Sequence, residues 1–360
     1  MQGIQVFDSE PYHGPSDYRA VSCENGFDAP KVLPVNDTTI DWWYFDAVAD
    51  DGISSLVVVF FLRGSNAGFP GPSYEGVPWV QVTGTYPNGT TFLLNFVGNE
   101  AIVSTSGQGA SGIWGGEHHN ISFTGTPDLS EYQIELKTDA ISGVFHVRST
   151  APPHYPCSQV LPGRTMEIVP GIGWANSIPD GDVTVDVEVN GTPLTFTGIG
   201  YHDKNWAVNG FNESLGSWYW GHARAGPYSL VWIDALTQEN EAHVSGYAVR
   251  DGQILSTRCD SNVQVRPVGQ NITHPPFPGS PTPDTYHLEM TLNDGTILSA
   301  DLLPAVQSGG IGMYARWVGN ITATVGDEVH EGLVSYEYFN FFGVDRLNFD
   351  IPNLEMTRQE

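Results

Sequence analysis

Alternation of β-branched and polar residues, punctuated by turn signals, is the feature that most constrains the fold of this chain. It is cleanest in residues 182–189, where valine takes every second position from Val183 to Val189. Asn190-Gly191 follows directly, and this pair is a strong signal for a two-residue hairpin turn. A period of two places alternate side chains on opposite faces of a strand. The stretch therefore predicts one arm of an antiparallel hairpin whose other arm is residues 194–201.

The same signature recurs along most of the chain. Short runs rich in Val, Ile, Thr and aromatic residues are separated by turn-forming Gly, Pro, Asn and Asp. With 41 glycines and 25 prolines the composition disfavours long helices, and only residues 345–356 carry a helical pattern. Short strands at this spacing are typical of β-sandwiches and β-barrels, so we expect an all-β fold. The other expected strands are residues 42–48, 54–62, 79–86, 90–97, 119–124, 132–138, 143–149, 172–175, 218–225, 228–236, 241–250, 253–259, 286–292, 297–303, 315–325 and 331–342.

A chain of 360 residues is long for one domain and comfortable for two. Its clearest irregular bridge is the proline-rich stretch 150–164. We therefore expect an N-terminal β-domain over residues 1–165 and a C-terminal β-domain over residues 166–360. The polar and aromatic segment 198–208 then lies near the interface between them.

Charge and motifs exclude several classes of function. The 14 basic and 41 acidic residues give a net charge of −27, which argues against nucleic acid partners and against docking on anionic membranes. No apolar run approaches the ~18–20 residues that span a bilayer, so we expect no membrane insertion. Glycine-rich nucleotide loops and the Gly-x-Ser-x-Gly elbow are absent from the sequence, which leaves nucleotide cofactors and serine hydrolysis without support. His118-His119 has no further ligand at zinc spacing, so we expect no metal site.

Other features favour the secretory pathway. The N-terminus lacks a basic start followed by an apolar segment, so a signal peptide would have to be missing from this sequence, and a cytoplasmic location is the alternative. Cys23, Cys157 and Cys259 permit at most one intrachain disulfide, and the sequence leaves the pairing open. Glycosylation sequons begin at seven asparagines, namely Asn36, Asn88, Asn120, Asn190, Asn212, Asn271 and Asn320.

Two carboxylates lie next to groups that can tune them. His202-Asp203, within the dense segment Tyr201–Trp206, is a candidate acid/base pair, because a histidine exchanges protons near neutrality. In a strand the two side chains point to opposite faces, so they would act together only at a bend; the alternative is that they tie down the chain. Asp41 precedes Trp42-Trp43, where burial would raise the pKa of its carboxyl; the alternative is a residue that only starts a strand.

Aromatic strands supply candidate walls for a pocket. Alternation places Trp218, Trp220, His222 and Arg224 on one face, and a face that ends in His and Arg is unusual for a dry core. Trp232 extends this wall to the next strand. A third group, near the C-terminus, shares one face and consists of Tyr336, Tyr338 and Asn340. The alternative for all these aromatic residues is a role in the core.

The pairing of DWWYFDA (Asp41–Ala47) with YHDKNWA (Tyr201–Ala207) resembles the carotenoid hydratase/AttH-like superfamily, which includes fungal pericyclases. The superfamily pattern is YHD-x-NWG, so Ala207 replaces the usual glycine and Lys204 occupies the variable position. The resemblance implies two lipocalin-like or sandwich-like β-domains with a substrate pocket between them. It also implies hydrophobic small-molecule substrates and no metal or organic cofactor.

The resemblance leads to a main hypothesis of a cofactor-independent pericyclase. It would be a (hetero-)Diels–Alderase that joins, for example, a tropolone-derived o-quinone methide to a sesquiterpene alkene, with Asp41 or His202 helping to expel water beforehand. The alternatives are a hydratase or isomerase, with Asp203 or Asp41 protonating an alkene, and a non-catalytic carrier of a hydrophobic metabolite. The expected catalytic residues are Asp41, His202, Asp203, His222 and Arg224, and the expected substrate-binding residues are Trp42, Tyr44, Trp206, Trp218, Trp220, Trp232, Tyr336, Tyr338 and Asn340.

Overall fold

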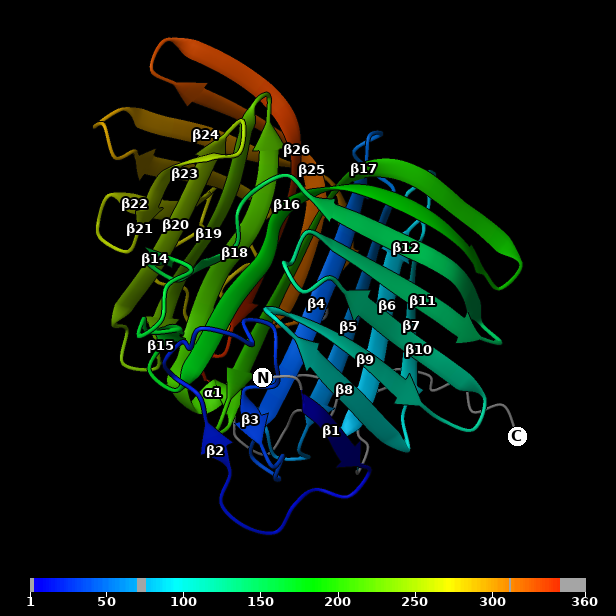
Figure 1. Ribbon diagram of the computed structural model, residues 1–360. Coiled ribbons are helices and arrows are strands. Elements are labelled where there is room, and N and C mark those ends of the chain that lie inside the picture. Colours follow the sequence, from blue (N-terminus) through cyan, green and yellow to red (C-terminus); the bar gives the residue numbers. More distant parts are fainter. Residues whose placement is uncertain (1–2, 70–75, 311, 344–360) are drawn as a thin grey trace.

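The computed structural model describes residues 3–69, 76–310 and 312–343. Two large antiparallel sheets make up most of the molecule, and Figure 1 shows the first on the right and the second on the left. The expectation of an all-β fold is confirmed. The helical pattern expected at 345–356 lies outside the described residues.

The first sheet has 15 strands and curls into a half-barrel. Three short strands flank its main path: β13 (His154–Tyr155), β14 (Ser158–Gln159) and β15 (Glu167–Val169). The main path runs β1 (Gly3–Asp8), β8 (Glu100–Ser106), β9 (Gly109–Gly115), β10 (His119–Gly125), β11 (Glu131–Thr138), β12 (Ile141–Ser149), β16 (Ile172–Val189), β17 (Thr192–Ala207), β4 (Ile40–Ala49), β5 (Ser55–Arg63), β6 (Pro78–Thr85) and β7 (Thr91–Val97).

The second sheet has nine strands and forms a nearly closed, lipocalin-like barrel. Its order is β21 (Gln253–Arg258), β20 (Ala242–Arg250), β19 (Tyr228–Thr237), β18 (Leu215–Ala225), β26 (Glu328–Asn340), β25 (Tyr314–Val325), β24 (Ile297–Gly309), β23 (Thr285–Thr291) and β22 (Val263–Val268). The Asp234 carboxylate on β19 bridges the seam, since it accepts hydrogen bonds from the Val265 amide (3.0 Å) and the Arg266 guanidinium (2.6 Å). These contacts hold β22 against β19 across the opening.

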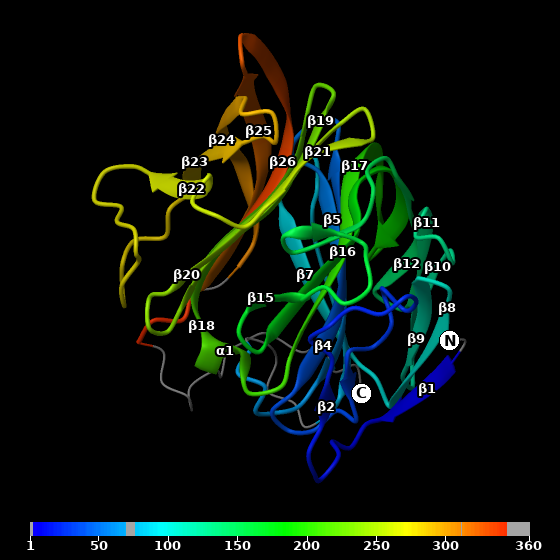
Figure 2. The same cartoon turned by 60° about the vertical axis from the view of Figure 1, so that its left-hand side comes forward.

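The change from one sheet to the other falls between Ala207 and Leu215. There the chain passes through a single turn of helix, α1 (Phe211–Ser214), which lies at the end of β18 in Figure 2. Strands β16 and β17 therefore belong to the first sheet, although the expected domain boundary at 165–166 precedes both. The division into two domains at residues 165 and 166 stays a prediction. A small ribbon of β2 (Asp17–Tyr18) and β3 (Val32–Leu33) completes the described strands.

The hairpin at Asn190-Gly191 forms as the sequence predicts. Both residues have positive φ (48° and 78°), as a tight hairpin turn requires, and Val189 pairs with Thr192. In β16 burial alternates near the turn but is continuous from Ile172 to Gly181. The difference arises because the hairpin end has one face in water, while the other half of the strand lies between two hydrophobic layers.

Three apolar layers result, and β4 separates two of them. Trp43 and Phe45 point into the core of the first sheet, while Trp42 and Tyr44 point toward the second sheet. The third layer fills the barrel of the second sheet and contains Trp232. The middle layer, between the sheets, is the one that can be shared with a ligand.

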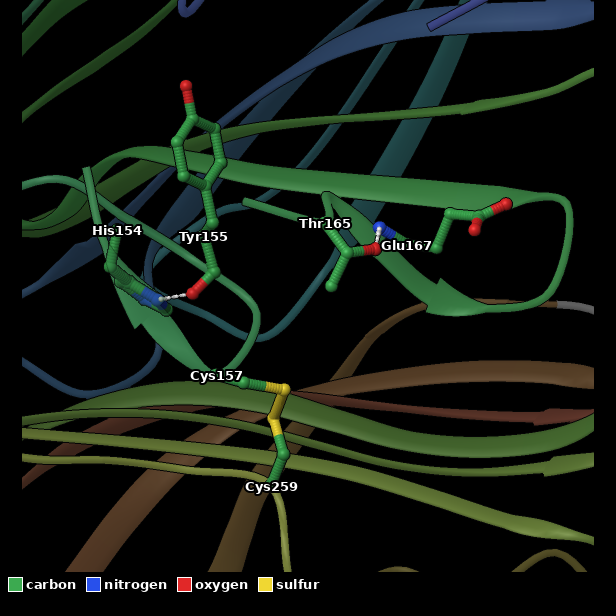
Figure 3. Close-up of a disulfide and its surroundings, with 6 residues drawn as sticks. All are labelled: His154, Tyr155, Cys157, Thr165, Glu167 and Cys259. Carbon is green, nitrogen blue, oxygen red and sulfur yellow. Dashed lines mark hydrogen bonds between the residues drawn. A yellow bond between two sulfur atoms is a disulfide. The ribbon is translucent and has the colours of Figure 1, made fainter. Parts of the chain in front are cut away.

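A disulfide between Cys157 and Cys259 links the two sheets, which settles the pairing that the sequence left open. Cys157 lies in the turn between β13 and β14, and Cys259 follows β21 (Figure 3). Cys23 is exposed and carries a free thiol. None of the helices in the described part of the chain has the length and apolar character of a membrane span.

Candidate active site

A cavity of about 380 Å³ lies in the middle layer, between the two sheets. One wall comes from β4, β5, β6, β7 and β17, and the opposite wall comes from β18, β19, β24, β25 and β26. This position agrees with the expected interdomain pocket. The aromatic side chains that line it are Trp42, Tyr44, Phe61, Phe69, Phe92, Trp218, Trp220, Tyr314 and Phe339.

Strand register explains which side chains reach the cavity. On the first sheet, β17 and β4 place Asp203 opposite Tyr44, and Asn205 opposite Trp42. All four line the cavity, as expected for neighbours that share one face of a sheet. The intervening pair, His202 opposite Phe45, points the other way.

The second sheet repeats this arrangement. Trp220 lies opposite Glu337, and Glu337 lies opposite Arg316 on its other side. Two residues along, Trp218 pairs with Phe339 at a ring distance of 4.9 Å. The indole Nε1 of Trp218 is buried and has no hydrogen-bond partner among the described residues.

Asp203 is the carboxyl whose surroundings best suit acid chemistry. It is 3% exposed, and its Oδ2 accepts hydrogen bonds from Trp174 Nε1 (2.6 Å) and the Tyr201 hydroxyl (2.7 Å). Burial raises the pKa of Asp203 to about 7, although the two donors oppose this shift. Oδ1 has no partner among the described residues and remains for the cavity, which Asp203 lines. A carboxyl with a pKa near 7 can both hold and release a proton near neutral pH, and Oδ1 is the oxygen left for that proton.

Tyr201 orients this carboxyl. Its ring stacks on the His222 imidazole at 4.7 Å, and its oxygen also contacts the side-chain amide of Asn176. The contact atom of Asn176 is its Oδ1, an acceptor, and the Tyr201 hydroxyl has a single hydrogen to donate to either Asn176 Oδ1 or Asp203 Oδ2. Tyr201 therefore links Asn176 and Asp203 through one hydrogen.

His222 belongs to a second chain behind the cavity wall. Its Nε2 lies 2.8 Å from Asp46 Oδ2, which also accepts the Tyr44 hydroxyl at 2.9 Å. His222 is fully buried and does not line the cavity, whereas Tyr44 does. Hydrogen bonds connect His222 to the cavity through Asp46 and Tyr44, and Asp46 is a residue that sequence reasoning missed.

A polar corner is built around Arg316, Glu337 and Tyr314, which all line the cavity. The Tyr314 hydroxyl donates to Glu337 Oε1 (2.6 Å), and Arg316 Nη1 lies 3.1 Å from the Tyr314 oxygen and 3.5 Å from Glu337 Oε1. Arg316 also donates to Thr83 of β6, so this corner joins the two sheets. Burial raises the pKa of the Glu337 carboxyl, and the Arg316 charge opposes that shift.

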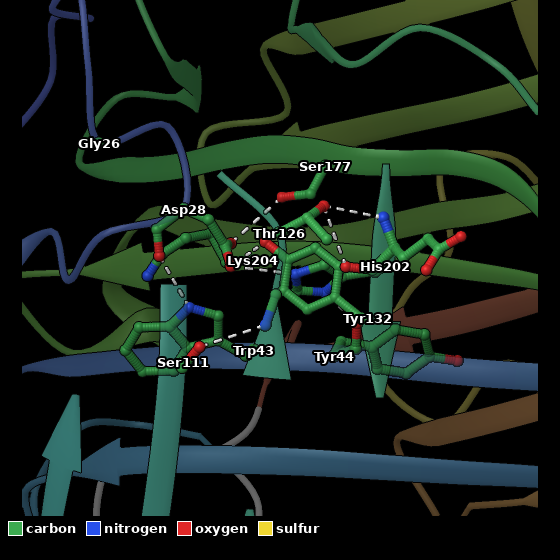
Figure 4. Close-up of polar contacts among 12 residues, drawn as sticks. Gly26, Asp28, Trp43, Tyr44, Ser111, Thr126, Tyr132, Ser177, His202 and Lys204 are labelled. Atoms are coloured by element: carbon green, nitrogen blue, oxygen red, sulfur yellow. Dashed lines mark hydrogen bonds and ion pairs between the residues drawn. The ribbon is translucent and has the colours of Figure 1, made fainter. Parts of the chain in front are cut away.

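The opposite face of β17 and β4 carries a separate buried network, shown in Figure 4. His202 stacks on Phe45 at 3.9 Å, and its Nε2 lies 3.2 Å from Asp28 Oδ2. Asp41 forms an ion pair with Lys204, both fully buried, and accepts the Lys31 amide (2.6 Å). Asp41 and His202 therefore lie in the core of the first sheet and are separated from Asp203 by the sheet itself. The structure does not bring the expected His202-Asp203 pair together.

Several expected site residues lie away from this cavity. Trp206 points into the core of the first sheet, and Arg224 clamps the sheets together through Asp180 at 2.8 Å. Trp232, Tyr336 and Tyr338 lie in the core of the second barrel, and the Asn340 amide donates to the Phe277 carbonyl (3.2 Å). The expectation for β26 selected Tyr336, Tyr338 and Asn340, whereas Glu337 and Phe339 face the cavity. Both faces of β26 are buried here, so alternation alone could not identify the cavity face.

Among the described residues, no group of three or more His, Cys, Asp or Glu side chains is placed to hold a metal ion. The polar groups of the cavity are instead hydrogen-bond donors and acceptors set among aromatic rings. Such a site can hold an apolar molecule, orient it by a few polar contacts and transfer a proton from Asp203.

Comparisons with known proteins give this geometry a context. Residues 5–266 match the Diels-Alderase-like family. The quinolone epoxide rearrangement protein penF of Penicillium thymicola is 34% identical, over 94% of this chain and 95% of its own length. The Diels-Alderase cheD of Chaetomium globosum is 30% identical over 64% of this chain and 55% of its own. The crystal structure of CghA with Sch210972 has a TM-score of 0.75 at 20% identity and covers 94% of this chain and 98% of that chain, so it shares the fold.

Proposed function

Since this chain belongs to the Diels-Alderase-like family, we propose that it is an enzyme that rearranges an epoxide carried by an aromatic, hydrophobic small molecule. A quinolone epoxide is the proposed substrate type, because a relative similar over nearly the whole chain carries that activity in its name. The single observation that supports the chemistry is the carboxyl of Asp203, which lines an aromatic cavity and whose pKa burial raises to about 7. No cofactor enters the proposal.

An epoxide opens when its oxygen receives a proton as a C–O bond breaks. Asp203 Oδ1 would supply that proton, since Oδ2 is occupied by Trp174 and Tyr201. Positive charge then develops on the carbon that loses oxygen, and the faces of Trp42 and Trp220 can stabilise it. A group migrates or an internal nucleophile attacks, and a proton returns to Asp203 when the product forms. The reaction is an isomerisation, so atoms and electrons balance without an added reagent.

The second candidate is a [4+2] cycloaddition, which the Diels-Alderase relatives favour. The cavity could hold two π-systems against its aromatic walls, while the Trp218 indole and the acid form of Asp203 donate to a carbonyl of the dienophile. The narrower expectation, an o-quinone methide joined to a sesquiterpene alkene, stays a prediction. Prior dehydration by Asp41 or His202 is not proposed, because both side chains point away from the cavity.

The test is incubation of the purified protein with a quinolone epoxide, followed by mass spectrometry and chiral chromatography. Epoxide rearrangement predicts a product of unchanged mass whose formation depends on Asp203. A hydratase would add one water and would incorporate heavy oxygen from labelled water, and a carrier would leave the rate equal to that of a buffer blank. Either of these results would contradict the proposal.

We also propose that the protein folds in an oxidising compartment. The disulfide between Cys157 and Cys259 supports this location. Of the sequon asparagines, Asn212 is buried and Asn36 is half-buried, whereas the exposed ones are Asn88, Asn120, Asn190, Asn271 and Asn320. An intact mass measured before and after glycosidase treatment of protein from a fungal host tests this proposal, and an unmodified chain with three free thiols would contradict it.

A further inference from the structure

The polar corner of the cavity has a donor left over on Arg316 and an acceptor left over on Glu337, and these carry a further inference. We propose that Arg316 and Glu337 together bind the C=O and N–H edge of a ring amide, a lactam, in the substrate. This inference rests on the proposed function only in taking the cavity as the substrate site. It adds the part of the substrate that is recognised, rather than the part that reacts.

The donor is an N–H group of the Arg316 guanidinium that has no acceptor among the described residues. A guanidinium has five N–H groups. Four contacts use them: Nε with Ser308 at 3.4 Å, Nη1 with Tyr314 and Glu337, and Nη2 with Thr83. Within the described part of the chain, one N–H of Nη2 has no acceptor. Arg316 is only 4% exposed and lines the cavity, so a ligand in the cavity is the acceptor that it lacks.

The acceptor comes from Glu337. Its Oε1 receives the Tyr314 hydroxyl (2.6 Å) and lies beside Arg316, whereas no donor in the described ranges reaches Oε2. Glu337 is 7% exposed and lines the same cavity. Burial raises the pKa of the Glu337 carboxyl, and the positive charge of Arg316 and the Tyr314 hydrogen bond oppose that shift. The Tyr314 hydroxyl and the Arg316 guanidinium both contact Oε1, as they would contact a carboxylate, which leaves Oε2 as an acceptor without a protein donor among the described residues.

The pair discriminates between ligand classes. A carboxylate ligand would pair with Arg316 but would be repelled by Glu337. An ammonium ligand would pair with Glu337 but would be repelled by Arg316. A ketone or ester offers only an acceptor and would leave Glu337 desolvated without a partner. A lactam presents C=O and N–H on the same edge, because the ring holds its amide cis. It is also neutral overall, as the ion pair is, and a fused aromatic lactam would fill the aromatic walls as well.

The experiment compares two probes by isothermal titration: carbostyril, a bicyclic aromatic lactam, and N-methylcarbostyril, which lacks the N–H. Carbostyril methylated on a ring carbon controls for size. We expect the wild-type protein to bind carbostyril and its C-methyl derivative at least about tenfold more tightly than the N-methyl derivative, since a hydrogen bond to a charged group is lost.

Two variants make the result specific. The double variant Arg316→Met, Glu337→Leu removes both charges together, so that neither is left buried alone, and it should bind all three probes alike. Asp203→Asn is the matched control elsewhere in the cavity and should keep the full preference for the N–H. Equal affinities of the wild-type protein for the parent and N-methyl probes, or no binding of either probe at millimolar concentration, would overturn the inference.

The two proposals fail separately. If the wild-type protein prefers the N–H probe but leaves a quinolone epoxide unchanged, the lactam site stands and the proposed reaction falls. If the protein rearranges the epoxide but shows no N–H preference, the reaction stands and the lactam site falls.

Discussion

Replacing Asp203 by asparagine separates acid catalysis from structure, because the two side chains have the same shape. The amide oxygen of the variant can accept the hydrogen bonds that Trp174 and Tyr201 now donate at 2.6 and 2.7 Å. The amide NH₂ then faces the cavity and can donate a hydrogen bond but cannot release a proton. We expect turnover to fall by about 10²–10⁴-fold, the usual contribution of a general acid, while substrate affinity changes little.

The same substitution has a calculable effect on stability. In the folded protein the pKa of Asp203 is about 7, against an ordinary value of 3.8, so the folded state binds this proton more tightly than the unfolded state does. The corresponding stability is fully present below about pH 4 and is lost as the pH rises through about 7. The gap between the two values corresponds to at most about 4 kcal/mol. Asparagine does not titrate, so the variant should lack this loss.

Urea unfolding at about pH 5 and about pH 8 measures the difference, and product formation is followed in parallel. We expect the variant to be nearly inactive. As the pH rises from about 5 to about 8, the wild-type protein should lose stability that the variant does not lose. Wild-type turnover in the variant would refute the assignment of Asp203 as the acid. If the stability difference between wild type and variant is the same at both pH values, the raised pKa of Asp203 is refuted.

Three further predictions follow from named contacts. Tyr201→Phe removes a donor that favours the charged form of Asp203, so the pH above which activity falls should rise by about 1–2 units in a pH–rate profile; a fall would contradict this. Asp41→Asn leaves Lys204 buried without its charge partner and should lower the free energy of unfolding by about 3–5 kcal/mol with little change in the kcat of the folded protein. A selective loss of kcat would restore Asp41 as a catalytic residue. Cys157→Ser should lower stability by about 5 kcal/mol, because the disulfide closes a loop with a sequence separation of 102 residues, whereas Cys23→Ser should have no effect.

The sequence predicts strands well where one face meets water. The arm ending at Val189 and its Asn190-Gly191 turn form as expected, since alternation and turn chemistry both report on local structure. It predicts the role of a side chain less well where both faces are buried. In β4, Asp41 and Trp42 are equally hidden, yet one faces the core of the first sheet and the other faces the cavity. The two-residue alternation along a strand assigns side chains to opposite faces but does not show which face lines the ligand cavity.

The polar corner shows a second limit. Arg316 and Tyr314 are neighbours on β25, but Thr83 of β6 lies far away in the sequence and meets Arg316 only because the sheets pack face to face. The signal that was available is a charged residue within an apolar strand, as at Glu337 between Tyr336 and Tyr338. A buried charge needs a partner, and the sequence does not name it. The sequence did identify four cavity residues, because each stands in a run of aromatic residues whose side chains alternate between both faces of the sheet. They are Trp42, Tyr44, Trp218 and Trp220.

The most direct test of the account is a crystal structure with an unreactive analogue of a quinolone epoxide bound. We expect the analogue in the cavity between the sheets, with the atom that replaces the epoxide oxygen about 3 Å from Asp203 Oδ1 and the rings against Trp42 and Trp220. An analogue bound inside the barrel of the second sheet, or beside His202 and Asp41 on the other face of β17, would contradict it.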